Sequence, residues 1–235
     1  MYKRIVLKLS GEALAGDKDG VSFDDSIIGG IVAQIKQVME QGTQVCVVVG
    51  GGNFWRGRSA TSQMDRTKAD QIGMLATVMN ALYLSDAFRQ AGILATVQTP
   101  IPFGTITELF SKDRAVKRLE DGELLIFAAG IGHPFFSTDT ITALRGAELE
   151  VDALFFAKNI DGVYDDDPSI NPNAKKIDEI KAEDVLKNNL KVIDIAAANL
   201  CYERKIPVVI FGLNEEKSII RAVGGEKIGT FVTVS

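Results

Sequence analysis

Short runs of consecutive apolar residues recur along this chain, and stretches with helical periodicity separate most of them. A strand that is apolar on both faces is typical of a parallel sheet that helices cover on both sides. The runs therefore predict an α/β fold, a three-layer α/β/α sandwich around a mainly parallel central sheet. The expected strands lie at residues 4–9, 45–49, 93–97, 124–128, 153–157, 208–211 and 231–234.

Capping residues and glycines mark where the helices between these strands should begin and end. Asp24 is a predicted N-cap, and apolar residues follow it at helical spacing until Gly42. A long helix is expected over residues 62–90, before Gly92, and a glycine-containing turn is expected after the first strand. No linker-like or repeated segment divides the 235 residues, so we expect one domain over residues 1–235.

The composition argues against several classes of protein. With 46% hydrophobic and 24% charged residues, the chain can bury a full core. Its net charge is −5 and it has no run of Lys and Arg, so we expect no binding to nucleic acid. Cys46 and Cys201 lie far apart in apolar stretches, which predicts neither a disulfide nor a zinc site. Lys8 interrupts the N-terminal apolar run, so we expect a cytoplasmic protein without a signal peptide or membrane span.

Glycine-bearing or polar segments follow four of the predicted strands. In sheets of this kind, ligands collect where strands end and helices begin. The four segments are therefore expected to meet at one active site. They lie at residues 10–12, 50–53, 130–133 and 158–162.

The segment after the second strand reads Gly50-Gly51-Gly52-Asn53. Glycines let backbone N–H groups approach an anion closely, so this segment predicts a phosphate-binding loop rather than a simple tight turn. It is not a P-loop. Gly52 and Gly57 have the P-loop spacing, but Arg58 replaces the lysine that reaches the phosphates in that motif.

Three further residues each have two interpretations. Lys8 lies in an apolar strand and is either an edge-strand lysine that reaches solvent or a phosphate-binding lysine. His133, the only histidine, is either a local hydrogen-bonding residue, which its neighbour Pro134 favours, or a catalytic group. Tyr164 belongs to an acidic segment that is either a solvated turn or a loop that packs against a nucleotide base.

Taken together, these segments resemble the amino acid kinase superfamily, and within it the bacterial uridylate kinases. The matching motifs cover nearly the whole chain and lie at residues 8–14, 49–53, 73–80, 134–139, 161–164 and 190–194. The first two motifs are shared by several amino acid kinases, whereas residues 73–80 and 134–139 are similar to uridylate kinases in particular. The resemblance implies a reversible, Mg²⁺-dependent transfer of the γ-phosphoryl group of ATP to UMP, giving UDP and ADP, in pyrimidine nucleotide biosynthesis.

The resemblance also implies roles for individual residues. The catalytic groups would be Lys8, Arg56 and Asp194, with Asp194 orienting the phosphate-binding cations. ATP, which would carry the Mg²⁺ ion, would contact Lys8, Leu9, Ser10, Gly11, Gly52, Arg56, Asn159, Tyr164 and Asp167. UMP would contact Gly51, Asp70, Ile131, Gly132, His133, Pro134, Phe135, Phe136, Ser137 and Thr138, with its ribose on Asp70. The N-terminal part of the chain would thus hold mainly UMP and the C-terminal part mainly ATP.

The long helix is apolar in nearly every direction around its axis between residues 72 and 84. Such a helix must be covered on more than one side. The sheet can cover one side, and either a second copy of the chain or another helix of the same chain the other. The resemblance implies a homohexamer. It also implies UTP as a possible inhibitor and GTP as a possible effector. Residues 16–21, however, depart from the glycine-rich pattern of the family's GTP region.

Two other functions fit the same motifs. A kinase of the same superfamily that acts on carbamate, acetylglutamate or aspartate would share the ATP half of the site. A catalytically silent nucleotide sensor or storage protein would share the fold alone. Turnover of UMP with ATP distinguishes the three.

Overall fold

The computed structural model describes residues 2–15, 23–55, 64–166, 168, 170–187 and 193–234. Its strands are β1 (Arg4–Leu9), β2 (Gln44–Val49), β3 (Ala95–Thr99), β4 (Glu108–Leu109), β5 (Leu124–Phe127), β6 (Ala153–Lys158), β7 (Val163–Tyr164), β8 (Lys176–Ile177), β9 (Glu179–Lys181), β10 (Val208–Gly212) and β11 (Thr230–Thr233). Its helices are α1 (Gly11–Ala15), α2 (Asp25–Glu40), α3 (Arg66–Gln90), α4 (Lys112–Glu120), α5 (Thr138–Glu148), α6 (Ala182–Lys187), α7 (Ile195–Arg204) and α8 (Ser218–Val223).

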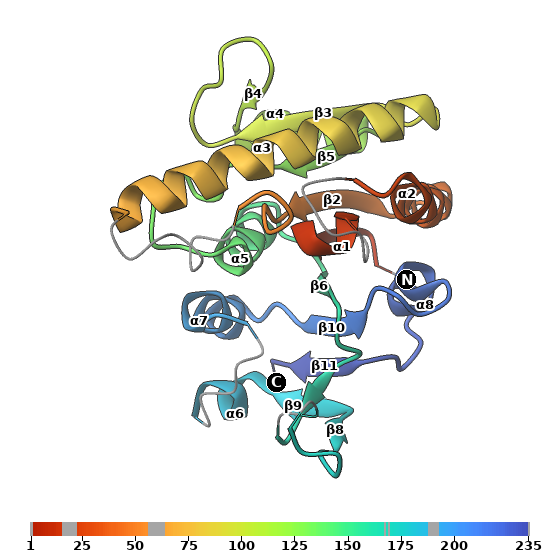
Figure 1. Cartoon of the computed structure of the whole chain (residues 1–235). Coiled ribbons are helices and arrows are strands. Elements are labelled where there is room, and N and C mark those ends of the chain that lie inside the picture. Colours follow the sequence, from red (N-terminus) through yellow and green to blue (C-terminus); the bar gives the residue numbers. More distant parts are fainter. Residues whose placement is uncertain are drawn as a thin grey trace.

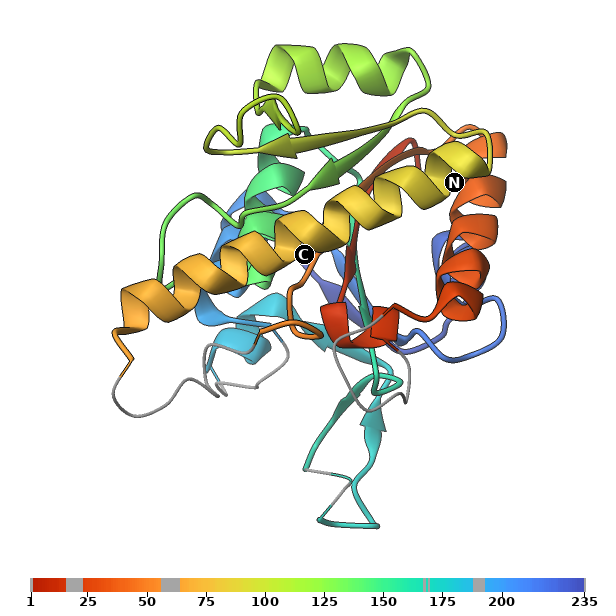
Figure 2. The ribbon, with the colours of Figure 1, turned by 45° about the horizontal axis from the view of Figure 1, so that its top comes forward.

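Nine of the strands form one sheet in the order β4-β3-β5-β2-β1-β6-β10-β11-β9 (Figure 1). Every neighbouring pair in it is parallel except β10 and β11, so the expectation of a mainly parallel sheet is confirmed. Strands β7 and β8 pair with each other in a separate antiparallel hairpin, which projects from the body of the molecule (Figure 2).

Alternate residues of the central strands point to opposite faces of the sheet, as the pleat of a strand requires. On one face Ile5, Leu7 and Leu9 pack with buried residues of α2, α3 and α8. On the other face Val6 and Val48 pack with buried residues of α4, α5, α6 and α7. The two cores have the sheet between them, and the three-layer prediction is confirmed.

Several element boundaries differ from the sequence prediction. The long helix begins at Arg66 rather than at residue 62, because the Asp65 side chain caps it by accepting the Lys68 N–H at 3.1 Å. Strand β3 begins two residues later than expected, because the Ile93 N–H still donates to Phe88 at the end of α3. The turn expected after the first strand is the short helix α1.

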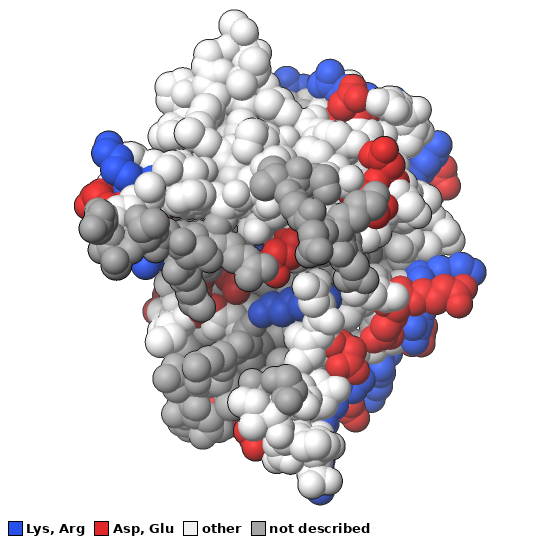
Figure 3. Space-filling model, in the orientation of Figure 1, with Lys and Arg blue, Asp and Glu red and all other residues white. Residues whose placement is uncertain are grey.

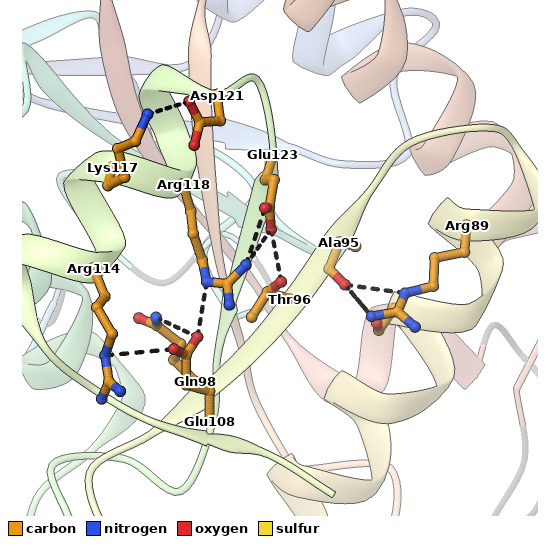
Figure 4. A network of polar contacts seen from close by, with 11 residues as sticks. Arg89, Ala95, Thr96, Gln98, Glu108, Arg114, Lys117, Arg118, Asp121 and Glu123 are labelled. Atoms are coloured by element: carbon orange, nitrogen blue, oxygen red, sulfur yellow. Dashed lines mark hydrogen bonds and ion pairs between the residues drawn. The ribbon is translucent and has the colours of Figure 1, made fainter.

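The short strands β4, β7, β8 and β9 were not predicted. Strand β4 pairs with β3 at the edge of the sheet, and a side-chain network, which Figure 4 shows, adds to that pairing. The Glu108 carboxylate accepts hydrogen bonds from Gln98 at 3.0 Å and from Arg118 at 2.9 Å. Arg118 also contacts Glu123 at 2.9 Å, which ties α4 to the start of β5. These three contacts join residues of different elements that are 10, 10 and 5 positions apart, so the periodicity of a single element does not predict them.

Candidate active site

The four segments that were expected to meet follow four neighbouring strands. Strands β5, β2, β1 and β6 are adjacent and parallel, so their C-terminal ends lie along one edge of the sheet. The segments at residues 10–12, 50–53, 130–133 and 158–162 continue the chain from these ends. In Figure 3, acidic and basic atoms meet in the middle of the face drawn, in the region where Figure 1 labels α1 and β6.

The glycine loop after β2 is held against α1 and α3 by close backbone contacts. A Cβ atom on Gly51 would lie 2.8 Å from the Ala76 Cβ and 2.9 Å from the Gly73 carbonyl oxygen, both in α3. A Cβ atom on Gly11 would lie 2.6 Å from the Gly52 nitrogen. These glycines therefore serve close approach, because any larger residue would push the loop away from its neighbours.

Asn80 anchors the same loop from the middle of α3. Its side chain is fully buried and donates to the Gly50 carbonyl at 2.6 Å and to the Asn53 side chain at 2.7 Å. A buried amide costs free energy unless it is hydrogen-bonded, so these bonds fix the position of the loop. Our sequence reasoning gave Asn80 no role. The only amide in the apolar stretch at residues 72–84 of this helix was the signal available.

Lys8 lies at the end of β1 on the face that α5 covers. Its side chain is 12% exposed, and its Nζ lies 3.3 Å from the Asp139 carboxylate. The edge-strand interpretation of Lys8 is wrong, because β1 lies between β2 and β6 in the centre of the sheet. A buried ammonium needs an anionic partner. Asp139, in the first turn of α5, is that partner. The predicted site did not include it.

Asp194 joins the beginnings of two helices. It is the N-cap of α7, where its Oδ1 accepts the Ala197 N–H at 2.8 Å. Its Oδ2 accepts hydrogen bonds from the hydroxyls of Ser137 and of Thr140, the latter at 2.8 Å. In the described part of the chain, its hydrogen bonds thus come from hydroxyls and a backbone amide, and they bring the N-termini of α5 and α7 together.

A pocket of about 180 Å³ opens between α3, the glycine loop and the segment after β5. Its lining residues are Gly51, Trp55, Ala69, Asp70, Gly73, Met74, Thr77, Gly130, His133, Phe136, Ser137 and Thr138. The Asp70 carboxylate accepts the Phe135 N–H at 2.8 Å and contacts Arg66 at 2.9 Å. The Thr77 hydroxyl accepts the Ala129 N–H at 2.8 Å, which fixes the segment from the other side.

The remaining predicted residues lie around this pocket and edge in different settings. Leu9 is fully buried in the core, so only its backbone can face a ligand, and Ile131 packs against the other core. Gly132 has a positive φ of 87° and lies against Pro100. Phe135 is 66% exposed.

On the other side of β1, the Tyr164 hydroxyl donates to the Asp161 carboxylate at 2.8 Å at the base of the β7–β8 hairpin. Asn159 follows β6 directly. Ser10 precedes α1, and its hydroxyl accepts the Ala13 N–H at 3.2 Å. Arg56, Asp167 and the segment at residues 16–21 lie outside the described residues, as do residues 190–192 of the last motif.

A sequence model of the amino acid kinase family matches residues 3–212. The chain belongs to the amino acid kinase family. Among solved structures, this amino acid kinase is similar to a UMP kinase from Bacillus anthracis, with 36% identity, a TM-score of 0.95, and coverage of 100% of this chain and 97% of that one. A UMP kinase from Ureaplasma parvum has 35% identity, a TM-score of 0.92, and coverage of 99% of each chain.

The uridylate kinase from Archaeoglobus fulgidus is more distant, with 27% identity, a TM-score of 0.74, and coverage of 97% of this chain and 99% of that one. The likeness to UMP kinases therefore extends over the full length of this amino acid kinase, and the resemblance stated from the sequence is confirmed. In the described residues, no helix is both long and apolar enough to cross a membrane.

Proposed function

We propose that this amino acid kinase is a UMP kinase, which transfers the γ-phosphoryl group of ATP reversibly to UMP and forms UDP and ADP. The observation that carries the proposal is the full-length likeness to UMP kinases at 36% and 35% identity. The rival functions, a kinase for carbamate or an amino acid and a silent sensor, share the fold without that likeness. The reaction would serve pyrimidine nucleotide biosynthesis in the cytoplasm, where both substrates occur.

The pocket beside α3 is the proposed UMP site. Gly51, Asp70, His133 and the loop up to Thr138 would surround the nucleotide, and Asp70 would accept hydrogen bonds from the ribose hydroxyls. Asp70 already holds the Phe135 N–H, so the same carboxylate would couple ribose binding to the position of the loop. UTP carries the same uridine group, and its inhibition of the enzyme at this pocket is part of the proposal.

The edge formed by β1, α1 and the glycine loop is the proposed phosphate site. Lys8, Ser10, Gly11 and Gly52 would surround the phosphates, with Arg56 nearby, and Asn159, Tyr164 and Asp167 would contact the ATP nucleoside. Asp194 would act by joining α5 to α7, so that Lys8 and Asp139 keep their positions.

The main task of the protein in this reaction would be to align two anions, ATP and UMP. The phosphate of UMP is already ionised, so its oxygen attacks the γ-phosphorus without a general base, and ADP leaves. Holding donor and acceptor in line can lower the barrier by roughly 7–11 kcal/mol. Lys8 would offset negative charge on the group in transfer. Because this mechanism needs no general base, it is compatible with a chain that has a single histidine.

Magnesium belongs to the proposal as the ion that ATP carries. Mg²⁺ takes oxygen ligands and is commonly held by phosphate oxygens together with one or two carboxylates. The carboxylate of Asp139 beside Lys8 suits that donor set. When bound, the ion would offset charge across the β- and γ-phosphates.

A substrate panel tests the proposed function. With MgATP, the protein is expected to convert UMP to UDP with a kcat/KM at least about 100-fold above that for CMP, because a site that hydrogen-bonds one base discriminates strongly against the other. Carbamate, acetylglutamate and aspartate serve as comparison acceptors. Equal turnover of CMP and UMP, turnover of one of the other acceptors, or nucleotide binding without turnover would each contradict it.

We also propose that the protein works as a homo-oligomer, a hexamer built from dimers. Helix α3 packs Ala76, Leu84 and Phe88 into the core. On its other side Leu75 and Met79 remain 51% and 47% exposed. Figure 3 shows few charged atoms over the middle of this helix. Among the described residues, no helix of the same chain covers these two side chains, so a second copy of α3 is the simplest cover.

Light scattering tests the assembly. The 25.4 kDa chain is expected to give the mass of six copies. The double variant Leu75→Lys, Met79→Lys should give a smaller species. The new ammonium groups of one copy of α3 would lie against those of the other copy, and their charges would repel. Tyr202→Lys, at an exposed apolar position on α7, is the matched control and should leave the mass unchanged. An active monomeric wild-type protein would refute the assembly, and a stable dimer would refute the hexamer.

A further inference from the structure

A second lysine lies at the same edge of the sheet as Lys8. Lys158 is the last residue of β6, the strand that pairs with β1 on one side and β10 on the other. Phe156, directly opposite Lys8 in the register, packs into the core below α5. Because strand side chains alternate, Lys158 lies on the same face as Phe156 and Lys8. Lys158 lies two residues beyond Phe156 along β6, and β6 is the neighbour of β1. The Cβ atoms of Lys8 and Lys158 are therefore about 8 Å apart, a distance that two lysine side chains can span.

Lys158 is partly buried, and a carboxylate and a second ammonium group act on it electrostatically. Burial lowers the pKa of Lys158 below its ordinary value; the nearby Asp139 carboxylate raises it and the Lys8 ammonium lowers it. Asp139 is thus a neighbour of both lysines and contacts Lys8 directly. Placing two ammonium groups side by side in a half-buried edge costs free energy, and such arrangements are concentrated at functional sites.

We propose that Lys158 is a second phosphate-binding lysine, which contacts the phosphoryl group in transfer from the side opposite the glycine loop. The proposal rests on the proposed kinase function. In the sheet order β2-β1-β6, the glycine loop follows β2 and Lys158 ends β6, so the end of β1 lies between them. A phosphoryl group above β1 would therefore meet backbone N–H groups on one flank and Lys158 on the other.

Lys158 takes no covalent part in the reaction. The bond between the γ-phosphorus and the oxygen that bridges to the β-phosphate breaks, and a bond from the γ-phosphorus to a phosphate oxygen of UMP forms. Lys158 keeps its proton throughout and offers N–H donors to the γ-phosphate oxygens. Preorganised charge of this kind stabilises a phosphoryl group during transfer, because it needs no reorientation in the transition state.

Substitution of Lys158 tests the proposal. Lys158→Ala should lower kcat with UMP and MgATP by about 100-fold or more, as loss of a preorganised donor does. Lys158→Met keeps the apolar stem and should show the same loss with an unchanged Tm, which separates the charge from the fold. Lys117→Ala removes an exposed lysine paired with Asp121 on α4 and should have no effect. A folded Lys158→Met variant with near-normal kcat would overturn the proposal.

Calorimetry with nucleotides distinguishes this proposal from the proposed function. If Lys158 contacts the γ-phosphate, Lys158→Met should weaken binding of a non-hydrolysable ATP analogue at least about 10-fold more than binding of ADP. Equal losses for both nucleotides would overturn the placement at the γ-phosphate. The measurement needs no acceptor. Wild-type protein that fails to phosphorylate UMP would defeat the proposed function, while the calorimetric comparison would still decide the role of Lys158.

Discussion

Replacing Lys8 by alanine is expected to lower kcat for UMP phosphorylation by about 100-fold or more. Lys8 is held in place by the central strand β1 and by Asp139 at 3.3 Å. A charge positioned in this way stabilises the transition state more than the bound substrates, and its loss therefore lowers kcat rather than raising KM alone. Steady-state kinetics with UMP and MgATP measure the effect.

A matched control accompanies the Lys8 variant. Lys112→Ala removes a lysine whose ion pair with Glu150 lies on the exposed surface, and its kcat should be unchanged. Because removal of Lys8 leaves Asp139 without that partner, the Tm of the Lys8 variant must be measured as well. A folded Lys8→Ala protein with near-normal kcat would mean that Lys8 serves packing rather than catalysis.

Gly11→Ala is expected to lower kcat/KM by about 100-fold and to destabilise the protein. The new Cβ would lie 2.6 Å from the Gly52 nitrogen and 2.7 Å from the Gly50 carbonyl oxygen. Both are backbone atoms, so no side-chain rotation can relieve the clash and the glycine loop must move. Overpacking typically costs about 1–3 kcal/mol of stability, and a misplacement of about 1 Å at a reacting centre can cost 100-fold in rate.

Gly30→Ala provides the control for that substitution. Gly30 lies in helix α2, and a Cβ atom there would have no atom within 4 Å. Alanine favours a helix over glycine by about 1 kcal/mol, so this variant should be fully active and its Tm should rise by a few degrees. If Gly11→Ala were as active and as stable as Gly30→Ala, the close packing of the glycine loop would not matter for the reaction.

The elements that sequence reasoning identified correctly are those whose signal is local. Strand β1 was expected at residues 4–9, where the structure has it. A strand that is buried on both faces needs consecutive apolar residues, and such a run can be recognised in the sequence alone. Helix α2 begins after Asp24 because that side chain caps its first turn through the N–H groups of Ser26 and Ile27. The glycines after β2 mark a closely packed loop for a similar reason, since few other residues allow such close approach; its role in binding phosphate stays a prediction.

Short or shifted elements were missed because their positions depend on contacts between different elements. Strand β4 has two residues, and its place depends on contacts of Glu108 with Gln98 and Arg118. Strand β3 starts late because the end of α3 uses Ile93 to complete its last turn. The hydrophobic periodicity of a segment predicts neither kind of contact.

The sequence by itself determined the layers of the fold, the family, and the four segments that follow the ends of neighbouring strands. Only the tertiary structure decided how the charges within the site are arranged. Asp139 meets Lys8 across 131 residues, Asp194 meets Thr140 across 54, and the pairing of β1 with β6 brings Lys158 to the same edge of the sheet as Lys8. The physical reason is that burial and hydrophobic periodicity are properties of a segment, whereas an ion pair or a hydrogen bond is a property of two segments that only folding brings together.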